Sequence, residues 1–236
     1  MARDGTASTL RPARSYVETA LMLDENVVVK LVARGVVADT FRRLSPEKKS
    51  QIYRAAIRLL GEYGYDGLSV DDLCHEAAIS KGSFFQYFPS KSHLLEFTVL
   101  VFDDYLAGWM AELRMNERAV LTRDRLRSLY QALAVDSRLS REEERFYLFI
   151  TNAMDHSAVK LEGIDIERHF SGYVTEIIAR GEQTGEIRGD FDVELTGRLT
   201  ALVIGTLVEG QYAGQRLPPR DMEEYLISFL FDGIKA

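Results

Sequence analysis

The sequence predicts an all-α fold with two parts, and three observations support this prediction. Apolar residues recur at helical spacing along almost the whole chain. No segment sustains the alternation of apolar and polar residues that marks a strand. The chain has 236 residues, which is enough for one large domain or two modest ones with buried cores.

The first predicted helices lie before residue 65. Apolar residues at near-helical spacing predict a helix over 24–44, with a break near Gly35. A second helix begins after Ser45, a good N-cap, with Pro46 at the first helical position, where its missing N–H costs nothing. The apolar face of this helix continues to Gly64.

Two short helices follow, joined by a tight turn. Ser69 resembles the start of a capping box and opens a helix that runs to about Ala77. Ser80 caps the next helix, which Pro89 ends after Phe88. Later helices are predicted over 91–115, 122–137, 140–156, 163–183, 190–213 and 219–234.

The charge of the chain is distributed unevenly. The net charge of -7 argues at first against a nucleic-acid partner. Residues 1–95, however, hold 13 Lys and Arg against 11 Asp and Glu, whereas residues 96–236 hold 16 against 25. Since only charges within a Debye length of about 8–10 Å matter to a bound ligand, a basic patch on the first part remains compatible with nucleic acid.

Membrane and secreted proteins do not fit this sequence. The longest apolar run, 99–109, is interrupted by Asp103 and Asp104, so no membrane span is expected. The first residues lack the apolar segment of a secretory signal. One cysteine, Cys74, permits no intramolecular disulfide; we interpret it as a small buried residue in a cytoplasmic protein.

Enzymes and metal proteins do not fit either. The sequence has no Gly-rich phosphate loop after a strand and neither a G-x-S-x-G nor an H-E-x-x-H motif. Asp155 with His156, and Glu167 with His169, match no strong ligand spacing and are interpreted as surface residues. No enzymatic activity, metal or cofactor is therefore predicted.

Two short helices that follow a longer one, with a tight turn between them, are typical of a helix-turn-helix. The second helix of this motif exposes its N-terminal residues to the major groove of DNA and anchors its inner face in the core. Phe84 and Phe88 are four residues apart and are predicted to face inward together. Gly82 permits a close approach of the backbone to DNA, at a helix-propensity cost of roughly 0.8–1 kcal/mol relative to Ala.

The stretch AAIRLLGEYGYDGLSVDDLCHEAAISKGSFFQYFPSKSHLL, residues 55–95, resembles the DNA-binding region of the TetR family of transcription factors. The resemblance implies that three helices bind DNA and that a fourth leads to a ligand-binding, dimerising domain. The last two helices of that domain usually form the dimer interface in this family. The implied domains are an N-terminal extension over 1–44, a helix-turn-helix domain over 45–92 and a ligand-binding and dimerisation domain over 93–236.

The resemblance also implies residue roles. Phe85 stands where the family usually has Tyr, so apolar contact with a thymine methyl is expected, and Gln86 is expected to read adenine. Lys81 and Gly82 are expected at bases or adjacent backbone, and the other positions at phosphates. The implied DNA contacts are Ser69, Val70, Ser80, Lys81, Gly82, Ser83, Phe85, Gln86, Tyr87 and Lys91.

The second part supplies many large apolar residues, which are either plain core or the wall of a pocket. The family resemblance implies a pocket, and the residues expected to line it are Trp109, Phe146, Phe149 and Tyr173. Small residues four apart predict a self-packing dimer helix with Gly197, Ala201 and Gly205 at its interface.

The extra helix over 24–44 either braces the DNA-binding unit or extends the dimer surface. The tail before it carries Arg3, Arg11 and Arg14 and is either solvated or in a minor groove.

Together these patterns predict a homodimeric regulator in a prokaryotic cytoplasm, most simply a repressor that a small-molecule effector releases from a palindromic double-stranded DNA operator. No membrane partner is expected. The alternatives are an activator, a regulator governed by a protein partner, and a helical interaction module without DNA binding.

Overall fold

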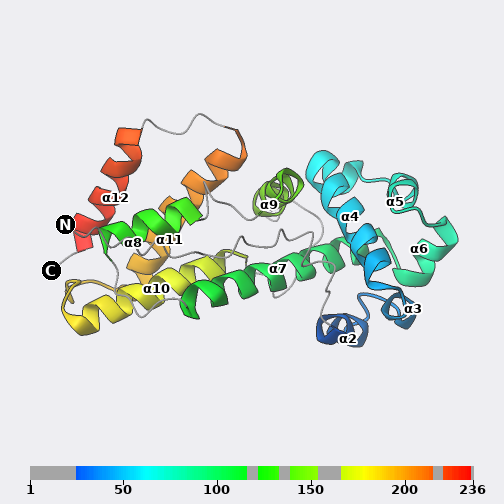
Figure 1. The fold of residues 1–236 in the computed structure, drawn as a ribbon, viewed down its shortest axis with the longest axis horizontal. Helices are drawn as coiled ribbons and strands as arrows, with labels where there is room; N and C mark the ends of the chain where they lie inside the picture. Colours follow the sequence, from blue (N-terminus) through cyan, green and yellow to red (C-terminus); the bar gives the residue numbers. More distant parts are fainter. Residues whose placement is uncertain (1–24, 116–121, 133–138, 154–165, 215–219, 235–236) are drawn as a thin grey trace, which may run out of the picture.

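In the computed structural model the described residues are 25–115, 122–132, 139–153, 166–214 and 220–234, and they form eleven helices. The all-α prediction is therefore confirmed. Figure 1 shows an elongated molecule, with the helices between residues 25 and 87 at one end and those between 123 and 130 and between 166 and 234 toward the other. The long helix α7 (Lys91–Met115) runs between the two ends.

The N-terminal helices are α2 (Glu25–Ala33) and α3 (Asp39–Arg42), so the predicted break in this region is confirmed. Gly35 lies in the break with a φ of 73°, a conformation that glycine adopts without steric cost. Phe41 is fully buried and attaches α3 to the core of this end of the molecule.

Helix α4 (Pro46–Gly67) begins as the sequence predicts, because the Ser45 side chain accepts a hydrogen bond from the amide of Lys48. Gly64 interrupts the helical geometry with a φ of 67° and kinks the helix three residues before its end. Helices α5 (Val70–Glu76) and α6 (Lys81–Tyr87) follow; α5 packs against α4 and α6, and α6 also packs against α3.

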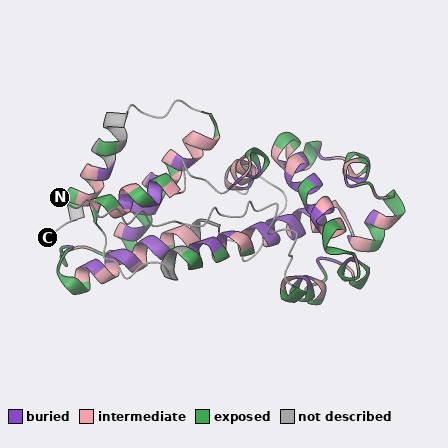
Figure 2. Ribbon diagram, in the orientation of Figure 1, coloured by how far each residue is buried: buried purple, intermediate pink, exposed green. Residues whose placement is uncertain are grey.

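The remaining helices are α8 (Arg123–Tyr130), α9 (Arg141–Ala153), α10 (Ile166–Thr184), α11 (Val193–Tyr212) and α12 (Arg220–Ile234). Helix α10 packs along α11, and α12 packs against α8. Figure 2 shows buried residues recurring along α7 and α10, which pack against each other. The predicted helices over 122–137, 140–156 and 163–183 extend in part beyond the described residues.

Helix α9 connects the two parts of the molecule, because it packs closely on α4. A Cβ atom built on Gly61 would lie 2.9 Å from the backbone nitrogen of Phe146, so this crossing needs glycine. Ser140 and Glu143 fix the start of α9: the Ser140 amide donates to the Glu143 carboxylate at 2.6 Å, and the Glu143 amide donates to the Ser140 hydroxyl at 3.3 Å. Burial raises the pKa of the Glu143 carboxyl, and the bonds to Ser140 oppose that shift.

Candidate DNA-binding site

Helix α6, which we call the reading helix, is held by two aromatic side chains and exposes others. Phe84 and Phe88 are fully buried with ring centroids 5.4 Å apart, so their predicted inward orientation is confirmed. Phe85 is 54% exposed, and Gly82 and Gln86 are exposed as well. The reading helix therefore presents a surface that the fold itself does not use.

Serines cap both short helices. The Ser69 hydroxyl accepts from the amides of Asp71 and Asp72 at 3.1 and 3.4 Å. The Ser80 hydroxyl accepts from the Ser83 amide at 3.0 Å, and the two hydroxyls share a further bond of 2.8 Å. Because two hydroxyls that share one bond retain one free O–H hydrogen, this pair keeps a donor for an external acceptor.

Two other predicted contacts, Val70 and Tyr87, are half-buried. Val70 packs on the core as the first residue of α5, so its amide rather than its side chain would face a phosphate. The Tyr87 ring packs edge-on against Phe41 with centroids 6.3 Å apart.

The two predicted lysines have different surroundings. Lys81 is exposed and pairs with Asp71, with Nζ 2.9 Å from Oδ1; the hydrogen bond and the charge of Asp71 raise the pKa of Lys81. The Nζ of Lys91 donates to the carbonyls of Tyr65 and Leu68 at 2.8 and 3.1 Å and lies 4.4 Å from the centre of the Tyr65 ring. Lys91 thus ties the start of α7 to the end of α4, a structural role that the sequence did not indicate.

The turn between α5 and α6 is held by a contact from α4. Ala78 has a φ of 47°, which is uncommon for a residue with a side chain. The Nζ of Lys48 donates to the carbonyls of Ala77 and Ala78, each at 3.3 Å. Sequence reasoning missed Lys48, although a cation in the first turn of a helix opposes the helix dipole and so indicates a partner elsewhere.

Gly82 has no structural reason to be glycine within the described residues. Its φ is not in the left-handed region, and a Cβ built on it would meet only the Ser80 hydroxyl, at 3.7 Å. Glycine inside a helix costs roughly 0.8–1 kcal/mol relative to Ala. A residue that costs stability and fills no packing need is best explained by a partner that approaches the helix backbone.

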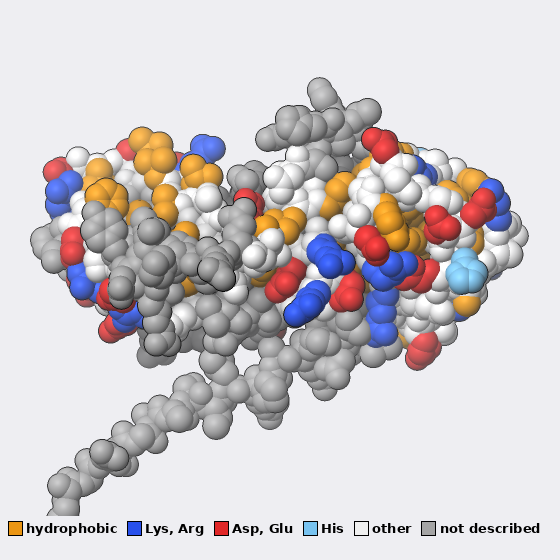
Figure 3. All heavy atoms as spheres, turned by 90° about the horizontal axis from the view of Figure 1, so that it is seen from above, with side chains coloured by type: hydrophobic (Ala, Val, Ile, Leu, Met, Phe, Trp, Pro, Cys, Tyr) orange, Lys and Arg blue, Asp and Glu red, His pale blue; other side chains and the backbone are white. Residues whose placement is uncertain are grey.

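The charge around the site is mixed. Figure 3 shows basic and acidic side chains interspersed over the end of the molecule that carries the helix-turn-helix. Asp71 and Asp72 in the first turn of α5 stabilise that helix but would repel a phosphate near Ser69. Any binding of DNA here depends on individual contacts rather than on a broad basic field.

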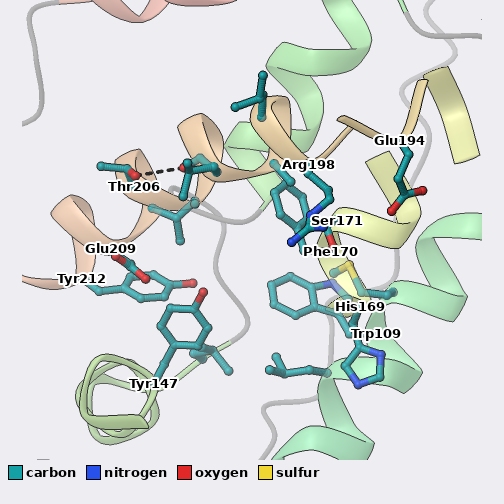
Figure 4. Close-up of a pocket in the computed structure, with 18 of the residues that line it drawn as sticks. Trp109, Tyr147, His169, Phe170, Ser171, Glu194, Arg198, Thr206, Glu209 and Tyr212 are labelled. Atoms are coloured by element: carbon teal, nitrogen blue, oxygen red, sulfur yellow. Dashed lines mark hydrogen bonds between the residues drawn. The ribbon is translucent and has the colours of Figure 1, made fainter. Parts of the chain in front are cut away.

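A pocket with a volume of about 800 Å³ lies in the other part of the molecule, between α7, α9, α10 and α11. Tyr147 and Tyr212 flank one side of it, with ring centroids 5.7 Å apart and perpendicular planes. Trp109, Phe170 and Arg198 flank the other side (Figure 4). Of the four predicted lining residues, Trp109 is the one that lines this pocket.

The other three predicted lining residues serve the core instead. Phe146 is fully buried and packs edge-on against Phe102 with centroids 5.3 Å apart. Phe149 packs against Phe146 on the side of α4, and Tyr173 is buried with its hydroxyl 2.8 Å from the guanidinium of Arg125. Helical spacing showed that these residues face inward, but not which inward face borders a pocket.

The small residues of α11 lie inside the chain or beside the pocket. A Cβ built on Gly197 would lie 2.7 Å from the Cα of Thr175, so Gly197 allows α11 to approach α10 of the same chain. Ala201 and Gly205 line the pocket, and a Cβ built on Gly205 would have no other group within 4 Å. Small residues predict that two helices approach each other closely. For Gly197, this close approach is between α11 and α10 of the same chain.

Groups of three or more potential metal ligands are not found among the described residues. His169 pairs with Asp103 at 2.9 Å. Asp155, His156 and the side chain of Glu167 lie outside the described part of the chain. Cys74 is buried as predicted, and burial raises the pKa of its thiol. No described helix has the length and apolarity needed to cross a membrane.

The sequence profile of the bacterial regulatory proteins, tetR family, matches residues 52–97, from α4 to the start of α7. Over these residues the chain has the sequence of a tetR-family DNA-binding region. The resemblance seen in the helix-turn-helix region is therefore confirmed. The proteins of this profile are regulatory proteins, which agrees with the prediction that the chain is not an enzyme.

Curated relatives match this chain over short stretches. YuxN, an uncharacterized HTH-type transcriptional regulator of Bacillus subtilis, is 45% identical over 49 residues, or 21% of this chain and 17% of that protein. IcaR of Staphylococcus aureus, the HTH-type negative transcriptional regulator of the biofilm operon icaADBC, is 40% identical over 58 residues, or 25% of this chain and 31% of that protein. The match thus spans less than a third of the length of either relative.

Solved structures resemble this chain over more than four fifths of its length. A TetR family transcriptional regulator from Chloroflexus aurantiacus covers 85% of this chain with 99% of its own, at a TM-score of 0.58 and 19% identity. A regulator of the same family from Cytophaga hutchinsonii covers 82% with 98% of its own, at a TM-score of 0.61 and 19% identity. At such identities the likeness concerns the fold.

Proposed function

We propose that this chain is a sequence-specific DNA-binding repressor. It acts in the bacterial cytoplasm as a homodimer on a palindromic operator, and a small-molecule effector releases it. The observation that carries the proposal is the exposed edge of the reading helix, where Gly82 costs helix stability and has no packing role. A negative regulator, IcaR, among the relatives supports repression over activation.

In this proposal Phe85 and Gln86 contact bases, because both are exposed on the reading helix. Lys81 and the Ser80–Ser83 hydroxyl pair bind phosphate. To do so, Lys81 must replace part of its contact with Asp71 by a contact with the phosphate. Ser69, Val70, Tyr87 and Lys91 make secondary backbone contacts.

Selection of duplexes from a library with a random core tests DNA binding directly. We expect a palindromic sequence with half-sites about one helical turn apart. On the selected duplex, Gln86→Ala should relax the preference at one base position by about 1–3 kcal/mol. Lys81→Gln should weaken binding to all sequences alike and reduce the salt dependence of log K by about 1. The proposal would be contradicted if the selection enriched no sequence and if neither variant changed the binding of DNA.

The dimer uses an exposed face of α11 that also borders the pocket, because Leu195, Leu199 and Leu202 are among the residues that line it. Leu195, Leu199 and Leu202 are each more than half exposed and lie four and three residues apart, so they share one face of the helix. A row of exposed leucines is typical of a protein interface, and a second copy with the same face would cover it by two-fold symmetry.

Analytical ultracentrifugation of Leu199→Glu tests this interface. The wild type should sediment as a dimer and the variant as a monomer. Val29→Glu is the matched control, because Val29 is an exposed apolar residue on α2 at the far end of the molecule. A Leu199→Glu protein that stays dimeric would place the interface elsewhere.

The effector binds in the pocket between α7, α9, α10 and α11, whose aromatic walls suit a ligand with a flat apolar body. Trp109 is the only tryptophan of the chain, so its fluorescence reports on the pocket without a label. We expect an aromatic effector to change the Trp109 emission and to release the selected duplex over the same concentration range. A compound library in which no member does both would contradict effector control through this pocket.

A further inference from the structure

Helix α3 is attached to the C-terminal end of the reading helix. The Ala38 amide donates to the Tyr87 carbonyl at 2.9 Å, and the Thr40 hydroxyl donates to the Gln86 carbonyl. The last carbonyls of a helix have no partner within it. The segment before α4, which the family profile does not include, therefore completes the end of the helix that is expected to meet DNA.

Helix α3 is also part of the same core. The Phe41 ring packs against Phe88 and Phe97 with centroids 5.4 and 5.0 Å away. On the other side, Arg34 at the end of α2 pairs with Glu96 of α7 at 3.4 Å. Packing thus fixes the position and the orientation of α3 relative to the reading helix, so the two helices belong to one structural unit.

The side chains that α3 exposes are basic. Arg42 is 48% exposed and Arg43 is 77% exposed, and each pairs with Asp39, at 3.9 and 2.6 Å. Burial lowers the pKa of Lys49 at the start of α4; the charge of Glu25 opposes this shift and the smaller effect of Arg42 adds to it. Two arginines are therefore exposed on a helix that packs against the reading helix, with Asp39 as their acidic neighbour.

We propose that α3 is a second DNA-contacting element, in which Arg42 and Arg43 bind backbone phosphates next to the base pairs read by α6. This proposal rests on DNA binding by α6. Guanidinium groups suit phosphate because they can donate two parallel hydrogen bonds. Figure 1 places α3 beside the reading helix and at the opposite end of the molecule from α11 and α12, so α3 braces the DNA-binding unit and does not extend the dimer face.

The test uses the full chain and a fluorescein-labelled duplex of mixed sequence, about 30 base pairs long, which is the length that two half-sites would occupy. Binding is measured by anisotropy between about 50 and about 200 mM salt, because each lost phosphate contact reduces the slope of log K against log salt by about 0.9. We expect Arg43→Gln to reduce the slope by about 1 and the double variant Arg42→Gln/Arg43→Gln by about 2. Asp39→Asn, which releases both arginines and removes a negative charge, should tighten binding.

Arg188→Gln is the matched control. Arg188 is half exposed and pairs with Asp190 at 3.0 Å in the loop after α10, so its replacement makes the same change in net charge far from α3. The thermal midpoints of all variants should stay near the wild-type value, because the altered side chains are exposed.

The outcomes separate the two proposals. A wild-type chain that binds the duplex without salt dependence would overturn DNA binding by α6 and α3 together. If the wild type binds with a salt slope that Lys81→Gln reduces, but the α3 variants behave like Arg188→Gln, then α6 binds DNA and the inference about α3 is wrong.

Discussion

The reading helix α6 and the helix α11 expose different kinds of surface. Helix α6 exposes one large apolar side chain, Phe85, among polar and small neighbours, whereas α11 exposes a row of three leucines. A polar surface with one apolar contact suits the edge of a base pair, and a continuous apolar row suits another protein surface. Each helix has residues of the same type in a buried and in an exposed position. Pairs of variants can therefore separate an effect on stability from an effect on the binding of a partner.

The largest expected effect concerns the two faces of α6. Phe88→Ala removes a fully buried ring from a cluster of aromatics and should lower the free energy of unfolding by about 3–5 kcal/mol. Phe85→Ala removes an exposed ring whose edge-on contact is with Phe84, 5.1 Å between centroids, and should change it by no more than about 1 kcal/mol. Urea denaturation of both variants measures the difference.

The affinity for DNA should show the reverse order. Among molecules that are folded, Phe85→Ala should lose more affinity than Phe88→Ala. Phe85→Ala should weaken binding to the selected duplex, because a thymine methyl loses its apolar contact. A Phe85→Ala chain as unstable as Phe88→Ala would show that Phe85 belongs to the core, and the contrast between the two faces of α6 would disappear.

The next effect compares two glycines of α11. Gly197→Ala places a methyl group within 2.7 Å of the Cα of Thr175, so α10 and α11 must separate; we expect a loss of about 3 kcal/mol. Gly205→Ala meets no atom within 4 Å and should raise the free energy of unfolding by up to about 1 kcal/mol through helix propensity. Thermal denaturation at several protein concentrations checks both and separates folding from dimerisation.

Equal losses for the two glycine variants would contradict the packing described for α10 and α11. A loss for Gly205→Ala alone, and one that grows on dilution, would show that Gly205 faces the second copy as the small-residue spacing predicts.

The helix-turn-helix could be predicted from the sequence because its signals are local. Ser45, Ser69 and Ser80 cap helices within three residues of themselves, and the inward positions of Phe84 and Phe88 follow from one helical period. The fold class followed from the same period, repeated along the chain.

The rest depends on contacts between residues distant in sequence. The wall of the pocket is set by how α7, α9, α10 and α11 cross, so Tyr147 and Tyr212 could not be distinguished from core residues such as Phe146. The attachment of α3 to α6 joins residues more than 40 positions apart, such as Thr40 and Gln86. Helical period alone carries no information on such pairs.

The two lysines of the site provide the third comparison. Lys91→Gln leaves the carbonyls of Tyr65 and Leu68 without their cation and should lower the free energy of unfolding by about 1.5 kcal/mol. Lys81→Gln breaks only an exposed ion pair with Asp71 and should cost less than about 1 kcal/mol. Chemical denaturation and measurement of DNA affinity on the same samples distinguish a lysine that stabilises the fold from a lysine that binds DNA.

If Lys91→Gln is as stable as the wild type and loses DNA affinity with a reduced salt slope, then Lys91 is a phosphate contact first and the bonds to Tyr65 and Leu68 are incidental.

The smallest expected effects come from two exchanges of alanine and glycine on either side of Ser80. Ala78→Gly relieves a φ of 47° and should raise the free energy of unfolding by about 1 kcal/mol. Gly82→Ala should also raise it by about 1 kcal/mol, because the new methyl group has room and Ala favours the helix. On stability alone the two variants should therefore look alike, by differential scanning calorimetry.

DNA affinity should separate them. Ala78 lies in the turn, and its replacement leaves the reading helix unchanged, so Ala78→Gly should bind the selected duplex as the wild type does. Gly82→Ala should bind it at least about tenfold more weakly, since a methyl group between the helix backbone and the duplex costs about 1.4 kcal/mol or more. A Gly82→Ala chain that is both more stable and fully active in DNA binding would leave Gly82 unexplained and would remove the main support for reading by α6.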